Sequence, residues 1–346
     1  MSLTDPELAA ALGDFIGQQT GQASGVRALT RLAGGASRLS YGFTLGAADR
    51  AGPQDMVLRL DRLGGLATSD RRQEFAVLGA AHRAGVRVPE VHWLGGEGDG
   101  LGGAFIVMER VGGEALGRRL LRDQRYAEAR SRLPAQLAAE LVRTHRIDPG
   151  QAGLALPSDG AAAGAPAEVG RYLELLGLVC GGRPQPVLEL AGRWLKAKAP
   201  PLDRTGLVHG DFRVGNFMFD ETGLVAVLDW ELAHAGDPLE DISWLSVRSW
   251  RFGNESAAVG GLCSRREFAR FYEEAGGAEL DPVRLAYWEL FGNWKWAIIC
   301  MMQAASYRAG PRPDLELAAI GRRVAEVEWE ILALLDDIES GSLGWN

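Results

Sequence analysis

The decisive stretch of this sequence, from Val208 to Asn216, reads Val-His-Gly-Asp-Phe-Arg-Val-Gly-Asn. Within it, Asp211 stands five positions before Asn216, and a second acidic residue, Asp229, follows in Leu-Asp-Trp-Glu. Asp and Asn are also common turn residues, so a chance arrangement in an ordinary loop is the alternative interpretation. The fixed spacing, the apolar runs around it and the second Asp together favour a functional site.

Two short apolar runs separate the stretch from Asp229. Residues 217–219 read Phe-Met-Phe, residues 224–228 read Leu-Val-Ala-Val-Leu, and Asp-Glu-Thr-Gly stands between them. Apolar runs joined by a short turn rich in Asp and Gly predict a β-hairpin. The hairpin would therefore separate the Asp-Asn loop from the second Asp.

Two carboxylates and one amide in this order suit phosphoryl transfer. This reaction needs little covalent help, so the enzyme mainly orients the acceptor hydroxyl and neutralises charge. One carboxylate would face the hydroxyl, while the amide and the second carboxylate would hold Mg²⁺ at the phosphates. Magnesium prefers hard oxygen ligands of this kind.

The region before the decisive stretch begins with a pattern of short strands. Residues 4–16 have the apolar spacing of an amphipathic helix, with Asp5 as a candidate cap and Pro6 in the first turn. Gly-rich breaks then separate short β-type runs, and a helical pattern stands among them. We expect strands at 27–32, 40–45, 56–60, 91–94 and 104–109, with a helix at 70–84 that starts near Ser69 and ends at Gly85.

After Gly112-Gly113 the pattern becomes mostly helical. Residues 149–166 are rich in Ala, Gly and Pro and predict a long surface loop. We expect helices at 114–122, 133–146, 169–197 and from about 239 to 335. A chain of 346 residues exceeds the size of one growing core. The fold class is therefore α+β, with a small β-rich lobe (1–110) and a larger, mainly helical lobe (111–346).

The composition is that of an ordinary globular protein and excludes several classes. The net charge of -8 argues against a dedicated nucleic-acid binder. The cysteines, Cys180, Cys263 and Cys300, are widely separated and form no Cys-x-x-Cys pair. We see no signal peptide, and no apolar stretch reaches the length of a membrane span. We expect a soluble, cytoplasmic protein whose partner is a small molecule, and its oligomeric state is open.

The decisive stretch resembles the aminoglycoside phosphotransferase and choline kinase branch of the protein-kinase-like fold. The catalytic loop of that branch reads H-G-D-x-x-x-x-N and is followed by a metal-binding Asp. The variant in this chain looks closest to the kinase-like domain fused to some acyl-CoA dehydrogenases. The resemblance extends from about residue 32 to residue 241. It implies an ATP- and Mg²⁺-dependent transfer of phosphate to a hydroxyl group of a small molecule.

The resemblance also implies roles in the catalytic loop. Asp211 matches the catalytic base, and Asn216 and Asp229 match the metal ligands. His209 would brace the loop rather than act as the base. Arg213 lies two residues after Asp211, where a cation could meet the transferring phosphoryl group; an ordinary surface arginine is the alternative.

The nucleotide side of the resemblance lies in the small lobe. Gly34 and Gly35, with Ser37 close behind, suit a turn whose backbone N–H groups approach phosphates. The family has a lysine on its third strand, but the first half of this chain contains no lysine. Arg59 occupies that position, and arginine can bind phosphate with two parallel hydrogen bonds. Glu74 on the following helix would be its partner, unless it is a solvated residue.

The end of the small lobe matches the family's hinge. Met108 would border the adenine pocket, and backbone groups of Glu109 and Val111 would bind the adenine edge. Further along, Asp241 is interpreted as a structural brace for the catalytic loop rather than a substrate ligand. The aromatic residues of segment 288–296 are more typical of a core than of a pocket, although helical spacing brings two of them to one face.

Two other functions remain open. A catalytically silent, kinase-like nucleotide-binding protein is the main alternative, and the replacement of lysine by Arg59 keeps it in view. Metal-dependent phosphoester hydrolysis through His209 and Asp211 ranks last, since two-metal hydrolases need more ligands. Neither the acceptor nor a preference for ATP over GTP can be read from the sequence. We favour a metabolic acceptor over an antibiotic, and the resemblance to the acyl-CoA dehydrogenase branch implies hydroxylated acyl compounds among the candidates.

Overall fold

The chain forms two compact units in the computed structural model. Unit 1 comprises Met1–Gly113 and Val225–Glu231, and unit 2 comprises Glu114–Leu224 and Leu232–Asn346. The structure describes residues 3–22, 25–32, 38–46, 52–61, 70–156, 164–310 and 315–342. A β-sheet dominates unit 1 and helices dominate unit 2, as the sequence predicts.

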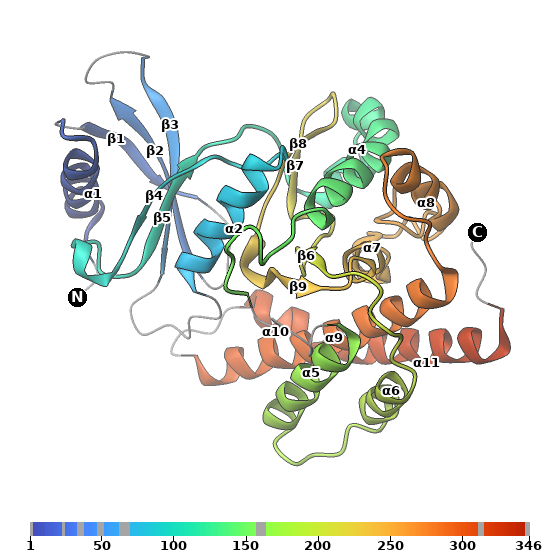
Figure 1. The fold of residues 1–346 in the computed structure, drawn as a ribbon. Helices are drawn as coiled ribbons and strands as arrows, with labels where there is room; N and C mark the ends of the chain where they lie inside the picture. Colours follow the sequence, from blue (N-terminus) through green and yellow to red (C-terminus); the bar gives the residue numbers. More distant parts are fainter. Residues whose placement is uncertain are drawn as a thin grey trace. The chain divides into compact units, whose positions relative to one another are not determined.

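Unit 1 is built on a five-stranded antiparallel sheet with the order β1-β2-β3-β5-β4 (Figure 1). Its strands are β1 (Gly25–Arg31), β2 (Arg38–Gly46), β3 (Gln54–Asp61), β4 (Val91–Gly95) and β5 (Phe105–Glu109). A short 3-10 turn, η1 (Glu97–Asp99), lies between β4 and β5. All the strands expected in this region are confirmed, with small differences at their ends.

Helix α1 (Asp5–Thr20) covers one face of this sheet (Figure 1). The helix and the sheet share one apolar core on this face. The core residues are Leu8, Leu12, Phe15, Ile16, Tyr41, Phe43, Met56, Leu58, Leu60, Leu101, Phe105 and Val107. Successive strand residues point to opposite faces, so Arg59 of β3 faces away from this core. Its side chain instead meets α2 (Arg71–Arg83).

The N-cap of the first helix of unit 1 differs from the expected residue, whereas the second helix begins as expected. Asp5, the candidate cap of the first helix, is the first helical residue, and Thr4 is the N-cap. Thr4 and Glu7 form a capping box, in which the Thr4 backbone N–H donates to the Glu7 carboxylate at 2.8 Å. The second helix is confirmed as α2, with Asp70 as its cap; Ser69 lies outside the described residues.

Unit 2 combines helices with a few very short strands. The helices are α3 (Gly117–Arg122), α4 (Ala127–His145), α5 (Ala165–Cys180), α6 (Pro186–Ala197), α7 (Leu239–Leu245), α8 (Arg265–Glu274), α9 (Pro282–Ala309), α10 (Leu315–Gly321) and α11 (Val324–Ser340), with 3-10 turns η2 (Gln124–Tyr126) and η4 (Arg248–Trp250). Strand β6 (Gly206–Val208) pairs with β9 (His234–Gly236). Strand β7 (Phe217–Phe219) is followed by β8 (Leu224–Val227), along which the chain passes into unit 1, and η3 (Trp230–Leu232) returns it.

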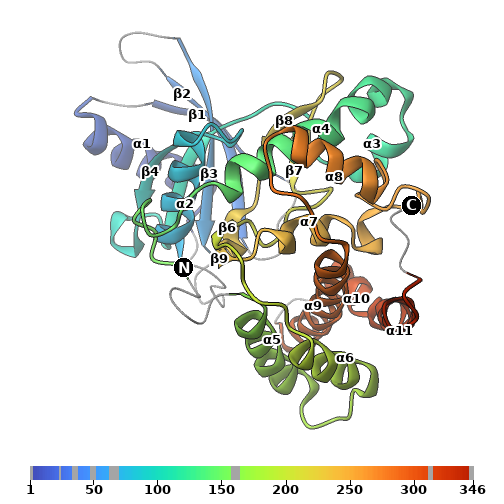
Figure 2. The same ribbon diagram turned by 45° about the vertical axis from the view of Figure 1, so that its right-hand side comes forward.

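Helix α9 lies in the middle of the helical part of unit 2, with α5, α6, α10 and α11 around it (Figure 2). Trp288, Phe291 and Trp294 on this helix are fully buried. The rings of Phe291 and Trp294 pack against Tyr172 of α5, with centroids 5.7 and 6.4 Å away. The interpretation of this aromatic segment as core is therefore confirmed.

Several helix boundaries in unit 2 differ from the expected ones. Helix α3 begins at Gly117 rather than at 114, because the Glu114 carboxylate accepts hydrogen bonds from the next two backbone N–H groups. The expected helix 133–146 starts earlier, at Ala127, and contains Pro134 in its interior. The expected helix 169–197 is two helices, because Gly181 adopts a left-handed φ of 57° after α5.

No helix in the described part of the chain is both long enough and apolar enough to span a membrane.

Candidate active site

The predicted catalytic loop follows strand β6 in unit 2. Phe212 and Val214 are buried, with 1% and 0% of their surface exposed, and they anchor the loop in the core of this unit. The Asn216 backbone N–H donates to the Arg213 carbonyl at 3.0 Å and closes a turn. Apolar residues at alternate positions thus fix the loop while Asp211 and Arg213 stay partly exposed.

The residue before Asp211, Gly210, has a backbone conformation and surroundings that require glycine. It has a left-handed φ of 80°, a conformation that residues with a side chain rarely adopt. A Cβ atom there would lie 2.4 Å from the Leu232 carbonyl oxygen. The backbone of the loop therefore passes too close to Leu232 for any residue except glycine.

Asp241 at the start of α7 holds the same part of the loop from the other side. Its carboxylate accepts hydrogen bonds from the backbone N–H groups of His209, at 2.7 Å, and Gly210, at 2.9 Å. Burial by itself would raise the pKa of Asp241, but its hydrogen bonds and the neighbouring His145 and His209 lower it below the usual value. The contacts match the structural role expected for Asp241.

Two buried histidines support this arrangement. The Nδ1 atom of His209 accepts a hydrogen bond from the Asp211 backbone N–H at 3.1 Å. His145 of α4 lies between the Tyr272 hydroxyl, at 2.9 Å, and the Asp241 carboxylate, at 3.3 Å. His209 thus uses a ring nitrogen to hold the backbone of Asp211, which is the contact expected of a residue that braces the loop.

Three side-chain donors hold the carboxylate of Asp211. Oδ1 accepts from Nε of Arg213 at 3.0 Å and from the indole Nε1 of Trp244 at 2.8 Å. Oδ2 accepts from the amide Nδ2 of Asn216 at 2.5 Å. The Arg213 guanidinium also lies 4.5 Å from the ring centre of Trp250. The structure therefore brings Asp211, Arg213 and Asn216 together, and it adds Trp244, which the sequence did not indicate.

The orientation of the Asn216 amide leaves its oxygen for another partner. Nδ2 donates to both the carbonyl and the carboxylate of Asp211. Oδ1 then points away from these acceptors as a neutral hard oxygen, the type of ligand that Mg²⁺ prefers. The chemistry of this side chain fits the metal role expected for it.

A buried lysine also contacts the loop, and no sequence pattern predicted it. Lys295 of α9 has 0% of its surface exposed, and its Nζ donates to the Gly210 carbonyl at 2.6 Å and to Glu240 at 3.0 Å. Its ammonium lies 4.6 Å from the ring centre of Trp244. The only signal available was its rarity, since the chain contains three lysines among its many basic residues.

Unit 1 carries the other charged group of candidate residues. One guanidinium nitrogen of Arg59 donates to Glu74 of α2 at 2.9 Å, and the other donates to Asp229 at 2.8 Å. Arg71 holds the second oxygen of the buried Glu74 at 2.7 Å. Burial by itself would lower the pKa of Arg59, but the two carboxylates raise it above the usual value. The expected pair of Arg59 and Glu74 is thus formed, and Asp229 joins it.

Asp229 has an unusual backbone for a residue other than glycine. Its φ is 65°, in the left-handed region that Asn and Asp tolerate better than most residues. The segment that carries it is tied to unit 1, where the Val227 backbone N–H donates to the Arg87 carbonyl at 2.7 Å. The carboxylate remains 37% exposed. A strained, partly exposed carboxylate of this kind is suited to binding a metal ion.

The other residues expected to bind the nucleotide lie at the end of β5 and in the glycine-rich segment. Met108 of β5 is buried, and the Glu109 backbone N–H donates to the Glu90 carbonyl at 2.8 Å. Val111 follows the end of the strand and is half-buried. The predicted phosphate turn with Gly34, Gly35 and Ser37 lies outside the described residues.

A cluster of three buried groups in unit 2 could in principle hold a metal ion: Glu168, His234 and Glu240. Its charges are already balanced by cations. His234 Nε2 lies 3.1 Å from Glu240, Lys295 donates to Glu240, and Arg171 donates to Glu168. Burial lowers the pKa of His234, but the two glutamates outweigh it and raise the pKa to about 9. The cluster is an ion-pair network, and it is not where the metal is expected.

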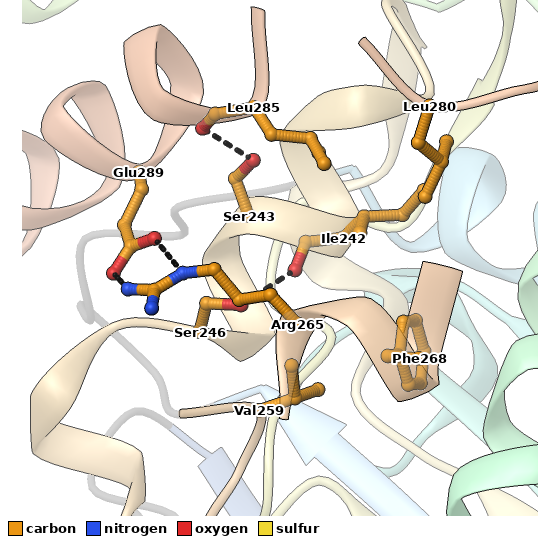
Figure 3. Close-up of a pocket in the computed structure, with 9 residues that line it drawn as sticks. All are labelled: Ile242, Ser243, Ser246, Val259, Arg265, Phe268, Leu280, Leu285 and Glu289. Carbon is orange, nitrogen blue, oxygen red and sulfur yellow. Dashed lines mark hydrogen bonds and ion pairs between the residues drawn. The ribbon is translucent and has the colours of Figure 1, made fainter. Parts of the chain in front are cut away.

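A small cavity lies beneath α7 in unit 2 (Figure 3). It is lined by Ile242, Ser243, Ser246, Val259, Arg265, Phe268, Leu280, Leu285 and Glu289. Its polar groups are bonded to their own neighbours: both serine hydroxyls donate to backbone carbonyls, and Arg265 pairs with Glu289 at 2.5 Å. None of the predicted site residues lines it, so we assign no ligand to it.

The fold and the loop define a class of protein. A β-sheet unit in which Arg59 of the third strand pairs with Glu74 of α2, and a helical unit with the His-Gly-Asp loop, form a protein-kinase-like fold. Residues 28–285 match the phosphotransferase enzyme family, which is most of the chain. The chain belongs to that family.

Curated relatives include acyl-CoA dehydrogenases. The acyl-CoA dehydrogenase family member 11 of Gallus gallus is 32% identical over 202 residues, which cover 56% of this chain and 25% of that protein. The family member 10 of Mus musculus is 44% identical over 61 residues, 17% of this chain and 6% of that protein. The matches thus span a quarter or less of these relatives.

Solved structures share the fold over nearly the whole chain. A structure from Ralstonia eutropha, provisionally assigned as an aminoglycoside phosphotransferase, has a TM-score of 0.71 and 24% identity and covers 93% of this chain and 97% of its own. A thermostable aminoglycoside phosphotransferase mutant, in ternary complex with AMP-PNP and hygromycin B, has a TM-score of 0.58 and 17% identity, with coverages of 96% and 99%. At these identities the likeness establishes the fold alone.

Proposed function

We propose that this protein is a kinase that uses ATP and Mg²⁺ to phosphorylate a hydroxyl group on a small molecule. The observation that carries the proposal is the carboxylate of Asp211, which three side-chain donors orient while it stays partly exposed. A carboxylate held in one orientation next to an Asn is what general-base catalysis of phosphoryl transfer requires. Family membership supports the reaction type.

Asp211 is the proposed catalytic base. Its carboxylate accepts the proton of the acceptor hydroxyl as the hydroxyl oxygen attacks the γ-phosphorus. The bond from the γ-phosphorus to the bridging oxygen breaks, and ADP leaves with that oxygen. Arg213 donates to Asp211 in this structure. In the reaction, the same guanidinium would turn to the transferring phosphoryl group and stabilise its charge.

Asn216 and Asp229 are the proposed metal ligands. The free amide oxygen of Asn216 and the exposed carboxylate of Asp229 are both suitable donors. A bound Mg²⁺ would neutralise the charge that develops on the ATP phosphates. Arg59 donates to Oδ1 of Asp229 at 2.8 Å in this structure, so a metal ion bound at this carboxylate would either share it with Arg59 or displace Arg59 from it.

The first lobe, residues 1–110, is proposed to bind the nucleotide, and residues 111–346 to carry catalysis and acceptor binding. Arg59 would contact the α- and β-phosphates, with Glu74 fixing its direction. The turn at Gly34, Gly35 and Ser37 would add backbone donors. Met108 and the backbone of Glu109 and Val111 would receive the adenine.

The acceptor is proposed to be a metabolite rather than an antibiotic. The curated relatives are acyl-CoA dehydrogenases, and this favours a hydroxylated acyl compound. The aminoglycoside complexes share the fold at low identity, so they do not transfer their substrates to this chain.

The test is a screen for ADP release with ATP, Mg²⁺ and a panel of hydroxylated small molecules, including hydroxyacyl compounds. We expect at least one acceptor to raise ADP release above the rate of the Asp211→Asn variant. Binding of ATP without any acceptor-dependent ADP release would instead support the silent nucleotide-binding protein. That alternative is favoured by one observation, the arginine in place of the usual lysine at position 59.

A further inference from the structure

Lys295 is the one described lysine that is buried. Lys196 and Lys198, at the end of α6, are exposed, whereas Lys295 has 0% of its surface exposed. Burial of an ammonium is costly unless each of its donors finds a partner. Its position is therefore maintained by specific contacts, and those contacts identify what it does.

The first contact is with the backbone immediately before the proposed base. Nζ of Lys295 donates to the Gly210 carbonyl at 2.6 Å. Gly210 is the residue whose backbone N–H is held by Asp241 and whose φ excludes other residues. Asp241 therefore holds the backbone N–H group of Gly210, and Lys295 holds the carbonyl group of the same residue.

The second contact connects Lys295 to the carboxylate of the proposed base through the ring of Trp244. The ammonium of Lys295 lies 4.6 Å from the ring centre of Trp244, at a distance typical of a cation–π interaction. The indole Nε1 of that ring donates to Oδ1 of Asp211 at 2.8 Å. Trp244 is 1% exposed, so its ring has little freedom to reorient independently.

Neutralising Glu240 does not by itself explain the lysine. His234 already pairs with Glu240 at 3.1 Å, and its pKa is raised to about 9, so it carries charge at neutral pH. Most basic residues of this chain are arginines, but the guanidinium group of arginine is planar and its donors have fixed directions. A compact ammonium can reach the Gly210 carbonyl, Glu240 and the face of Trp244 from one point.

We propose that Lys295 is a positioning residue for phosphoryl transfer, which holds both the Gly210 backbone and the Trp244 ring and thereby sets the orientation of the Asp211 carboxylate. The inference rests on the proposed function of Asp211. It adds a residue on α9, more than eighty positions further along the chain, to the apparatus of the loop.

The informative variants separate positioning from charge balance. Lys295→Met removes the contacts with Gly210, Glu240 and Trp244, together with the longer one to the Tyr172 ring at 5.7 Å, and it leaves Glu240 with one partner fewer. The double variant Lys295→Met/Glu240→Gln removes the excess negative charge as well, so it keeps the test usable if the single variant does not fold. Lys196→Met is the matched control, because it removes an exposed lysine from the same unit. Circular dichroism establishes which variants are folded.

The first readout is steady-state kinetics with an acceptor found in the screen. We expect the folded Lys295 variants to lose about tenfold to a hundredfold in kcat, since small misplacements of a catalytic group cost this much. The KM for ATP should stay within about twofold, because the proposed nucleotide contacts lie in unit 1. Lys196→Met should match the wild type in both.

The second readout does not need turnover. In protein labelled with ¹⁵N-tryptophan, the indole N–H signal of Trp244 is identified as the one that disappears in Trp244→Phe. It should move in Asp211→Asn, which weakens its acceptor, and also in the double Lys295 variant, but not in Lys196→Met. An absence of any acceptor-dependent ADP release in the wild type would sink the proposed function, while this signal would still test Lys295.

Two results would overturn the inference. One is a folded double variant with wild-type kcat, which would reduce Lys295 to a charge partner of Glu240. The other is a Trp244 indole signal that moves in Asp211→Asn but stays unchanged without Lys295, because the lysine would then have no effect on the ring that holds the carboxylate.

Discussion

At the scale of single residues, the two carboxylates of the proposed site are held in different ways. Asp211 receives three side-chain donors and lies on a loop anchored by buried neighbours. Asp229 has a left-handed backbone and bonds to Arg59. The first arrangement suits a base whose carboxylate must keep one direction, and the second suits a metal ligand whose carboxylate already lies next to a cation.

Asp229 should therefore matter for metal-dependent nucleotide binding. Replacing it with alanine removes one charged ligand, and we expect ATP affinity in the presence of Mg²⁺ to fall about tenfold or more, or at least ~1.4 kcal/mol. Affinity in EDTA should change little. Calorimetric titration of both proteins with and without metal checks this, and an equal loss in both conditions would contradict the assignment.

Arg59 should tolerate lysine but not alanine. Lysine keeps the positive charge toward the phosphates, so Arg59→Lys should bind ATP within about threefold of the wild type, or ~0.7 kcal/mol. Arg59→Ala should lose about tenfold or more, and it should fold because Arg71 still pairs with Glu74. Arg72→Ala, which removes an exposed arginine from α2 in the same unit, is the control. Wild-type ATP affinity in Arg59→Ala would place the phosphates elsewhere.

At the scale of elements, the loop after β6 depends on the start of α7. Asp241→Asn should replace one acceptor by an amide N–H that faces a backbone donor. We expect unfolding free energy to fall by about 2–4 kcal/mol, since both backbone groups are buried. Urea denaturation measures this, and the exposed Asp336→Asn on α11 should stay within about 0.5 kcal/mol. A loss of similar size in both variants would argue against the bracing role.

The sequence predicted elements well where local signals were strong. The alternating strands and the helix α2, predicted at 70–84 and found at Arg71–Arg83, follow from periodicity and caps. The predicted boundaries were wrong where a single contact determines where a helix begins. At Glu114, for example, the carboxylate accepts hydrogen bonds from the next two backbone N–H groups, so the helix begins later. Strand β9, which reads His-Ala-Gly, has no β-type composition and forms only because β6 is beside it.

The site was predictable to the extent that its residues are close in sequence. Asp211, Arg213 and Asn216 lie within one loop, so their spacing indicates the chemistry. Trp244 and Lys295 reach that loop from separate helices, and no local pattern marks them. The bond between Arg59 and Asp229 joins residues 170 positions apart, and only the folding of unit 1 reveals it.

At the scale of the whole molecule, the buried ion-pair network in unit 2 links stability to pH. It joins His234 to Glu168 of α5, Glu240 of α7 and, through Glu240, Lys295 of α9. His234 has a folded pKa of about 9 against an ordinary value of 6.5. Its contribution to stability is complete below about pH 6.5 and is lost as the pH rises through about 9.

Stability should therefore fall on the alkaline side in a way that depends on His234. The shift corresponds to a contribution on the order of 3 kcal/mol. We expect the difference in unfolding free energy between wild type and His234→Gln to shrink between pH 6.5 and 10. Denaturation at several pH values measures it, with the exposed His82→Gln as the control. A difference that stays constant over this range would show that His234 is not charged in the folded protein.

We propose that Asp211 makes this member of the phosphotransferase enzyme family an active kinase. The most direct measurement is the amount of phosphorylated acceptor, detected by mass spectrometry, that wild type and Asp211→Asn form from equal ATP and Mg²⁺. We expect product from the wild type and a loss of about a thousandfold or more in the variant, with ATP affinity nearly unchanged. Equal product from both proteins would contradict it.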